Sequence, residues 1–368
     1  MRFRRKAKLF PGVYLNFSKS GISTTIGVPG ASINFGKKGT YLNTGIPGTG
    51  FYDRQKLDGN NAKPHYNPQN YPLQINTSVY DSGAIGSKDA ESTTSQGLIQ
   101  LKKTLIDCYQ ERNDLRNEII KAKSKLIIVT ILWILSCIII IGFLIKQIKQ
   151  FQIDAKESLN DLQSQLQKCF INIDFEIDQQ FEKSYLELLD KYKTLMTSNR
   201  IWDITSSATI DQLTTRSAAT TTVKRKPIKF GFGNIDIIKS KYDAMHFENA
   251  NGGDIYIYPA FIVLVDGKEK FGLIDIQDLD FIFYEQRFLE QEPIPSDTIV
   301  VGNTWAKVNK NGTPDKRFKD NYSIPICQYA GMELKSITGL NEAYLFSSFS
   351  KSNQFSNKMI EYQKAIRK

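Results

Sequence analysis

The chain has 368 residues, of which 41% are hydrophobic and 11% aromatic, and it carries a formal net charge of +10. This composition excludes a wholly disordered chain, and the length is enough for two domains. The two histidines, His65 and His246, lie far from any second metal ligand or nucleophile. The four cysteines are also scattered, so we expect no disulfide framework, no metal, no cofactor and no histidine-based triad.

Residues 1–57 hold most of the positive charge. They contain ten basic residues and one acidic residue, which leaves about +1 for the rest of the chain. Basic residues beside Phe3 and Phe10 are typical of a surface that binds anionic lipid, or single-stranded nucleic acid by stacking and phosphate contacts. The alternative is a solvated basic face without a ligand. The candidate anion-binding residues are Arg2, Arg4, Arg5, Lys6 and Lys8.

An internal repeat with a period of 18 residues runs through this basic segment. Gly27-Val-Pro29-Gly30 is echoed by Gly45-Ile-Pro47-Gly48. Proline suits the second position of a tight turn and glycine the third, and the flanking residues alternate as in half-buried strands. The repeat therefore predicts a small antiparallel β module over residues 1–57.

The segment MRFRRKAKLFPGVYLNFSKSGIS, followed by IGVPGASINFGKKGTYLNTGIPGTGFY, resembles the DUF4236 domain, a bacterial module of uncharacterised function. The resemblance covers about residues 1–54 and rests on the basic-aromatic start and the two Pro-Gly turns. It implies no catalytic residues. The glycine-rich turns lack the GK[ST] ending of a phosphate-binding loop.

Residues 58–94 are rich in Asn, Gly, Ser and Pro and predict a flexible linker. Residues 95–125 then show apolar residues at alternating steps of three and four. This spacing predicts a coiled-coil-like helix. Its positions are Leu98, Leu101, Leu105, Cys108, Leu115, Ile119 and Ala122, with Arg112 at one further position.

Residues 126–145 form a run of 20 residues without a charge. At about 1.5 Å per residue the run would cover roughly 30 Å, the thickness of a bilayer core, so it predicts one transmembrane helix. The alternative is a buried core helix. Five basic residues before the run against three after it favour a cytoplasmic N-terminus and a single-pass protein of the inner membrane.

Residues 146–200 continue the helical seam through Ala155, Leu159, Leu162, Leu166, Cys169 and Ile173. They predict a long stalk, and the seams on both sides of the apolar run favour a homo-oligomer held by a coiled coil. The alternative is a helix that folds back on its own domain. Residues 201–227 are rich in Ser and Thr and predict a second linker.

Residues 228–368 predict a mostly-β domain with a terminal helix. Strands are expected at 254–259, 261–266, 270–276, 280–285, 298–308, 323–329 and 341–348, and a helix at 354–367. This order of elements resembles that of a pleckstrin-homology-like barrel. The predicted fold class is therefore a multidomain α+β membrane protein.

Within this domain, polar and basic residues gather around an Asn-Gly turn and a Pro-Asp turn. Such a loop can bind an acidic or phosphorylated partner. The alternative is a structured hairpin in which Asn309 and Asp315 cap turns and the basic residues face water. The candidate binding residues are Trp305, Lys307, Lys310, Lys316 and Arg317.

These features predict a membrane-anchored binding, sensing or scaffold protein without catalytic residues. Two alternatives remain open at this point. The first is a nucleic-acid-binding protein held at the membrane, and the second is an enzyme of the hydrolase class with its site in residues 228–368.

Overall fold

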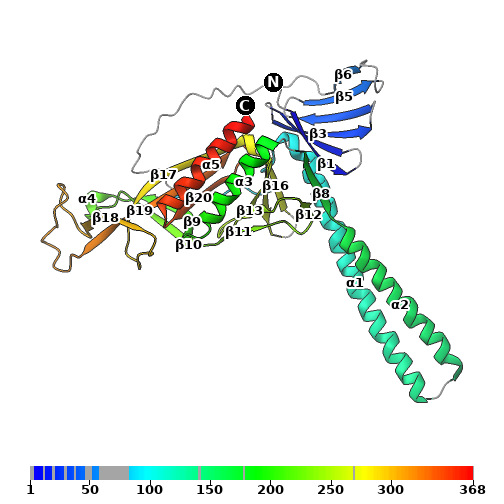
Figure 1. Cartoon of the computed structure of the whole chain (residues 1–368). Helices are drawn as coiled ribbons and strands as arrows, with labels where there is room; N and C mark the ends of the chain where they lie inside the picture. The colour runs from blue at the N-terminus through cyan, green and yellow to red at the C-terminus, as the bar shows by residue number, and fades with distance from the viewer. Residues whose placement is uncertain are drawn as a thin grey trace.

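A computed structural model of the chain describes residues 4–10, 13–18, 21–28, 31–36, 39–45, 52–57, 83–139, 142–176, 179–267 and 270–367. Figure 1 shows three β-sheets, a pair of helices that covers two of them, and a helical hairpin that projects from the body. Most of the linker expected at 58–94 lies outside the described residues, and its last residues, from Gly83 onward, are part of the fold.

The N-terminal segment forms an antiparallel meander, as its repeat predicts. Its strands are β1 (Arg4–Phe10), β2 (Val13–Ser18), β3 (Gly21–Val28), β4 (Ala31–Gly36), β5 (Gly39–Gly45) and β6 (Tyr52–Lys56). Two strands from later in the chain extend the sheet beyond β1. β8 (Ile171–Glu176) pairs antiparallel with β1, and β12 (Ile238–Ser240) pairs parallel with β8. The module is therefore part of an eight-stranded sheet.

Two further sheets form the C-terminal body. A five-stranded sheet contains, in order, β11 (Phe230–Gly233), β13 (Ala244–Phe247), β14 (Asp254–Ile257), β15 (Phe261–Asp266) and β16 (Lys270–Asp275). A seven-stranded sheet has the main order β10 (Thr221–Pro227), β9 (Ile201–Thr209), β20 (Asn341–Phe346), β19 (Ser323–Ser336) and β17 (Leu279–Leu289). In the same sheet, β18 (Ile299–Trp305) pairs with β19, and β7 (Gly83–Ala84) pairs with β9.

Two helices, α3 (Gln179–Leu195) and α5 (Phe349–Arg367), lie side by side on these two sheets (Figure 1). Their apolar faces share one buried cluster with strands of both sheets. Tyr192 of α3 stacks on Phe247 at 5.3 Å between ring centroids, and its hydroxyl donates to the His246 carbonyl at 2.6 Å. The shorter elements are α4 (Gln212–Thr215) and the 3-10 helices η1 (Gln96–Leu98) and η2 (Ile276–Asp278).

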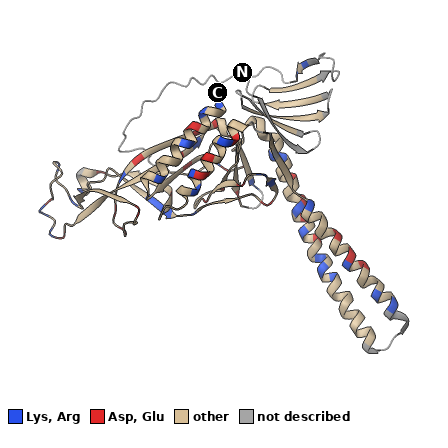
Figure 2. Cartoon of the chain, in the orientation of Figure 1, with Lys and Arg blue, Asp and Glu red and all other residues tan. Residues whose placement is uncertain are grey.

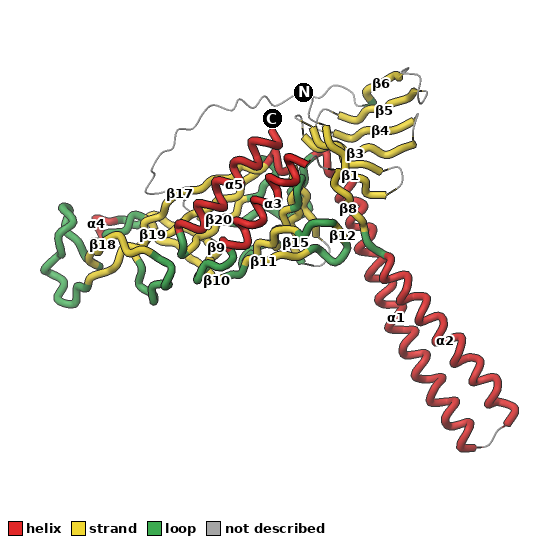
Figure 3. The backbone as a smooth tube through the Cα atoms, in the orientation of Figure 1, coloured by secondary structure: helices red, strands yellow, loops and turns green. Residues whose placement is uncertain are grey.

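The apolar run at 126–145 does not form the predicted transmembrane helix. It is divided between α1 (Ile99–Ile139) and α2 (Gly142–Lys168), which pack antiparallel as a hairpin (Figure 3). Among the described residues, no helix is both long enough and apolar enough to cross a membrane. The predictions of a single-pass topology and of an inner-membrane location are therefore wrong on this finding, whereas the predicted binding of membrane lipid stays a prediction.

The stalk predicted over 146–200 is also wrong, because α2 ends at Lys168 and is followed by β8 and α3. The two predicted seams meet each other inside one chain. Ile119 of α1 and Ala155 and Leu159 of α2 are buried, and Gln152 Nε2 donates to Thr130 Oγ1 at 3.1 Å. The alternating spacing thus reflects packing within the hairpin, so it no longer supports a coiled coil between copies.

The N-terminal module is not separated from the rest of the chain, contrary to the prediction. Leu15 and Ile22 share a buried cluster with the start of α1, with β8 and with one face of the five-stranded sheet. The Ile22 amide donates to Asp275 Oδ2 at 2.6 Å, and the Thr24 hydroxyl donates to the Gly97 carbonyl at 2.9 Å. Both bonds are buried, so the base of the hairpin and the module pack as one unit.

In the C-terminal region the seven predicted strands and the terminal helix are confirmed to within a few residues at most ends, although β19 runs on to Ser336. Residues 201–227, expected as a linker, instead form β9, α4 and β10, because the first four residues of β9, IWDI, are all buried and the strand pairs with β20 and β10. The strands divide between two open sheets, so the outline of a single pleckstrin-homology-like barrel does not describe them.

Candidate functional site

The β18 arm, which we define as β18 together with residues 306–322, lies at the end of the body away from the helical hairpin (Figure 1). Ile299, Val300 and Val301 are consecutive and all exposed, the first at 60%. Successive strand residues point to opposite faces, so both faces of β18 are open to solvent. β19 is the one described strand that pairs with β18, which leaves its outer edge unpaired among the described strands.

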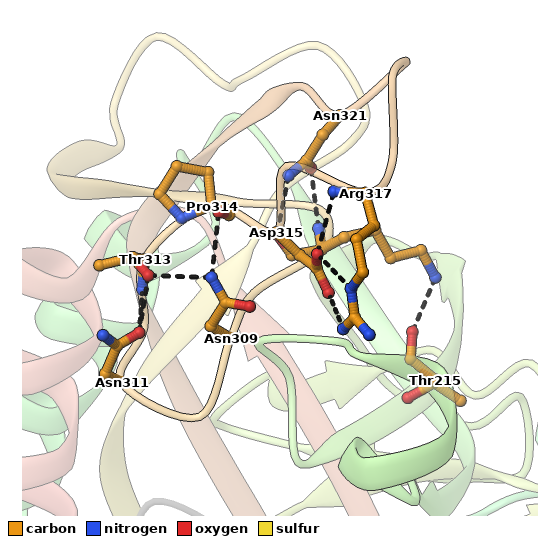
Figure 4. Close-up of polar contacts among 9 residues, drawn as sticks. Thr215, Asn309, Asn311, Thr313, Pro314, Asp315, Arg317 and Asn321 are labelled. Atoms are coloured by element: carbon orange, nitrogen blue, oxygen red, sulfur yellow. Dashed lines mark hydrogen bonds and ion pairs between the residues drawn. The ribbon is translucent and has the colours of Figure 1, made fainter.

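The loop of the arm is folded by its own polar side chains (Figure 4). Asn309 Nδ2 donates to Thr313 Oγ1 at 3.0 Å, and Asn321 Nδ2 donates to the Lys307 carbonyl at 2.8 Å. Asp315 is buried and accepts from Nε and Nη2 of Arg317 at 2.9 and 2.5 Å. These hydrogen bonds from Arg317 lower the pKa of Asp315 to about 2. The loop is thus a structured element, and Asn309 and Asp315 stabilise its turns.

The predicted binding residues fall into two groups. Arg317 pairs with Asp315, and Lys307 Nζ donates to the Thr215 carbonyl at 2.8 Å, so these two cations hold the arm together. Lys310 and Lys316 are exposed and have no ion-pair partner among the described residues. Trp305 is 38% exposed at the end of β18. The free charge and the exposed apolar surface therefore lie within one short segment.

The predicted anion-binding cluster at the N-terminus is only partly described. Arg2 lies outside the described residues, and Arg4, Arg5, Lys6 and Lys8 lie on β1, where the side chains are not described. The backbone register places Lys6 opposite Glu176 and Lys8 opposite Asp174 of β8. Opposite charges at facing positions stabilise a sheet. The pairing with β8 thus places these two lysines at strand positions opposite acidic residues, which sequence alone does not indicate.

Three buried polar side chains gather where β9 meets β20. Tyr344 faces Asp203 across the strands, and Glu342 lies two residues earlier on the same face. Glu342 Oε1 accepts from the amide and hydroxyl of Ser87 at 2.9 and 2.5 Å, and Asp203 Oδ2 accepts from the Ala250 amide at 2.8 Å. Asp203 Oδ1, Glu342 Oε2 and the Tyr344 hydroxyl have no hydrogen-bond partner among the described residues.

This cluster does not form a metal site, since the described part of the chain contains no group of three or more His, Cys, Asp or Glu side chains placed to hold an ion. Burial, with a smaller contribution from the charge of Asp203, raises the pKa of Glu342 to about 7 against the hydrogen bonds from Ser87. Burial likewise raises the pKa of Asp203. Burial in this cluster therefore favours the protonated forms of Glu342 and Asp203.

The cluster predicts a specific pH dependence of stability. The pKa of Glu342 is raised from 4.5 in the unfolded chain to about 7 in the fold. The native state therefore binds the proton more tightly, and the stabilisation is complete below pH 4.5 and lost as pH rises through 7. At about 1.4 kcal/mol per pKa unit, the loss amounts to about 3 kcal/mol. Glu342→Gln should remove this fall in urea-unfolding free energy between pH 5 and 8.

The matched control is Glu118→Gln, which replaces an exposed carboxylate on α1. Its pH profile should follow that of the wild type. A Glu342→Gln profile that also follows the wild type would contradict the assignment of the buried proton to Glu342.

Residues 1–54 match the family model described as "Protein of unknown function (DUF4236)". The N-terminal meander is thus a DUF4236 domain, and the chain is a DUF4236 domain-containing protein. Comparison with curated proteins and with solved structures gave no match. The family match confirms the resemblance read from the Pro-Gly turns, and it covers only the β1–β6 part of the eight-stranded sheet.

Two features of the site were missed by reasoning from sequence. The run Ile299-Val-Val301 predicts a strand, but its three apolar residues suggest a buried one, whereas the structure exposes them. The signal available was Gly302, because a glycine inside a strand often marks a bulge and the register with β19 shifts between Val300 and Gly302. Asp203 and Glu342 gave no signal, since they are 139 residues apart and meet only through the β9–β20 pairing.

Proposed function

We propose that this protein is a non-enzymatic binding protein that captures an extended acidic peptide segment along the β18 arm. The observation that carries the proposal is the exposed, apolar edge of β18, which pairs with no described strand on its outer side, beside Lys310 and Lys316, which have no ion-pair partner among the described residues. A peptide that adds a strand to a sheet gains main-chain hydrogen bonds from the edge and specificity from alternate side chains. β18 offers both kinds of contact.

The surface of β18 supports an apolar component in the partner. Ile299 and Val301 lie on the strand itself, and Trp305 extends the exposed surface toward the loop. Exposed apolar edge strands are avoided in proteins because they pair with other chains. An edge that remains apolar and uncovered is therefore suited to pair with an extended strand of a binding partner.

The charge of the arm supports acidic residues in that partner. Residues 305–322 contain five basic residues against the two acidic residues Asp315 and Asp320, and Arg317 already compensates Asp315. Complementary charge steers an encounter and disfavours partners of the same sign. The expected partner therefore alternates apolar and acidic residues in an extended conformation.

The test is fluorescence anisotropy of the full chain with a labelled ten-residue peptide that alternates Val and Glu. Saturable binding is expected, and Trp305→Ala and the double variant Lys310→Glu/Lys316→Glu should each weaken it at least tenfold. These three residues are exposed or partly exposed at the surface, so the fold should survive their replacement.

The matched control is Lys193→Glu/Lys364→Glu, which makes the same change of net charge at exposed positions on α3 and α5. It should leave binding unchanged. Equal weakening by the control, equal binding of a Val-Lys peptide, or full competition by a 20-residue oligothymidylate would each overturn the proposal. The last of these outcomes would instead favour a nucleic acid as the partner.

A further inference from the structure

Helix α1 carries a second apolar stripe besides the one that packs on α2. Ile120, Ser124, Ile127, Ile131 and Ile134 follow one another at steps of four, three, four and three. The four isoleucines are 62%, 60%, 52% and 47% exposed, and Ser124 is exposed as well. Steps that alternate between three and four place side chains on one line of a helix, as in the seam of a coiled coil.

The stripe has no partner within the described part of the chain. A different face of α1 is already occupied, because Ile119 is buried and Thr130 accepts a hydrogen bond from Gln152 of α2. Ile128 and Leu135 flank the stripe and are also exposed, at 58% and 46%. Figure 2 shows that α1 carries no charged residue from Leu126 onward, and the hairpin stands clear of the body there.

We infer that a second copy of this chain covers the stripe, with the two α1 helices antiparallel and Ile127 of each copy facing Ile131 of the other. The inference rests on the hairpin and not on the proposed function of the β18 arm. The stripe is complementary to itself in this register, since the small Ser124 of each copy then faces the large Ile134 of the other.

The area of the stripe is enough for such a contact. At roughly 100 Å² of exposed surface each, the six apolar side chains present roughly 600 Å² per copy, which reaches the lower bound of about 1,200 Å² in total for a specific interface. The side chains are aliphatic and uncharged, and aliphatic seams are what pairs of helices bury.

The lysines beside the stripe decide the direction of the two helices. Lys121, Lys123 and Lys125 precede the apolar length on α1. In a parallel pair each lysine would lie beside the same lysine of the other copy, and the like charges would repel each other. In the antiparallel register Lys123 faces position 135 and lies about 18 Å along the axis from its counterpart. That separation exceeds the Debye length of about 8–10 Å, so repulsion is screened.

The experiment is sedimentation equilibrium of the full chain, with circular dichroism to check that each variant is folded. The wild type should be a dimer at micromolar concentration, and Ile127→Glu/Ile131→Glu should raise the dimer dissociation constant at least a hundredfold. The control Gln147→Glu/Ser158→Glu places the same two charges at exposed positions of α2 and should remain a dimer. A wild-type chain that sediments as a monomer would overturn the inference. A wild-type chain that cosediments with lipid vesicles as a monomer would overturn it as well.

The relative direction of the two α1 helices is tested by disulfide trapping in a Cys137→Ser background. A mixture of the Ser124→Cys chain and the Ile134→Cys chain should form an intermolecular disulfide between the two variants. Ser124→Cys alone should form none. A disulfide between two Ser124→Cys chains would show parallel helices and overturn the antiparallel arrangement.

Discussion

Replacing Gly97 with alanine is expected to detach the DUF4236 sheet from the base of the hairpin. A Cβ at position 97 would lie 1.8 Å from the Ile22 carbonyl oxygen and 2.8 Å from its carbon, which are backbone atoms and cannot rotate away. Strand β3 would have to move, and the buried bonds from Ile22 to Asp275 and from Thr24 to Gly97 would be lost. Overpacking and these bonds together should cost about 3 kcal/mol.

The measurement for Gly97→Ala is the urea midpoint, together with the rate of proteolysis in residues 83–98. We expect a lower midpoint and faster cleavage. Gly233→Ala is the control, because a Cβ there meets no atom within 4 Å. Its midpoint should match that of the wild type, and a wild-type midpoint for Gly97→Ala would show that β3 does not pack on η1 this closely.

The second large effect is expected at the ion pair of Arg225 and Glu290. The two side chains form two hydrogen bonds of 2.9 and 2.8 Å, and the exposed fractions of the side chains are 9% and 1%. The guanidinium lies 4.4 Å from the Trp202 ring and 4.6 Å from the Phe288 ring, and the Tyr329 hydroxyl donates to Glu290 at 2.6 Å. Burial disfavours the Glu290 charge, but the bonds from Arg225 and Tyr329 outweigh burial and lower its pKa.

Arg225→Met keeps the apolar stem between the two rings and leaves the Glu290 carboxylate without its cation. Removal of one partner of a buried pair costs about 3–5 kcal/mol. Urea unfolding should show this loss for Arg225→Met and a much smaller one for Arg225→Met/Glu290→Met, in which no charge is stranded. Lys270→Met is the control, because the Lys270–Asp89 pair is about half exposed and should contribute less than about 1 kcal/mol. Equal costs for the single and double variants would contradict this account.

Local patterns were enough to predict the elements whose partners are neighbours in sequence. The two Pro-Gly turns predict the β1–β6 meander, and alternation predicts strands such as β15 and β20. The apolar run at 126–145 was misread because composition alone does not distinguish one long span from the ends of two packed helices. Gly142, where α2 begins, was the one local signal of a break.

Elements that depend on distant partners could not be predicted. Ile173 fits the seam of a helix, yet it lies in β8, which is fixed by pairing with β1 and β12. At the β18 arm, sequence identified the loop and its cations. It could not assign Arg317 to Asp315 and Lys307 to Thr215 while Lys310 and Lys316 stay free, because that division depends on where the loop folds.

The pairing of β1 with β8 also sets an order for synthesis of the chain. The DUF4236 strands leave the ribosome before β8, so the edge of β1 stays bare until residues 171–176 have been made. The buried face at Leu15 and Ile22 likewise waits for α1 and the five-stranded sheet. More than a hundred residues separate the two events. An early sheet with an open edge and an uncovered apolar face is prone to aggregate. The nascent chain is therefore most exposed to misassembly, and most in need of a chaperone, while the helical hairpin is being translated.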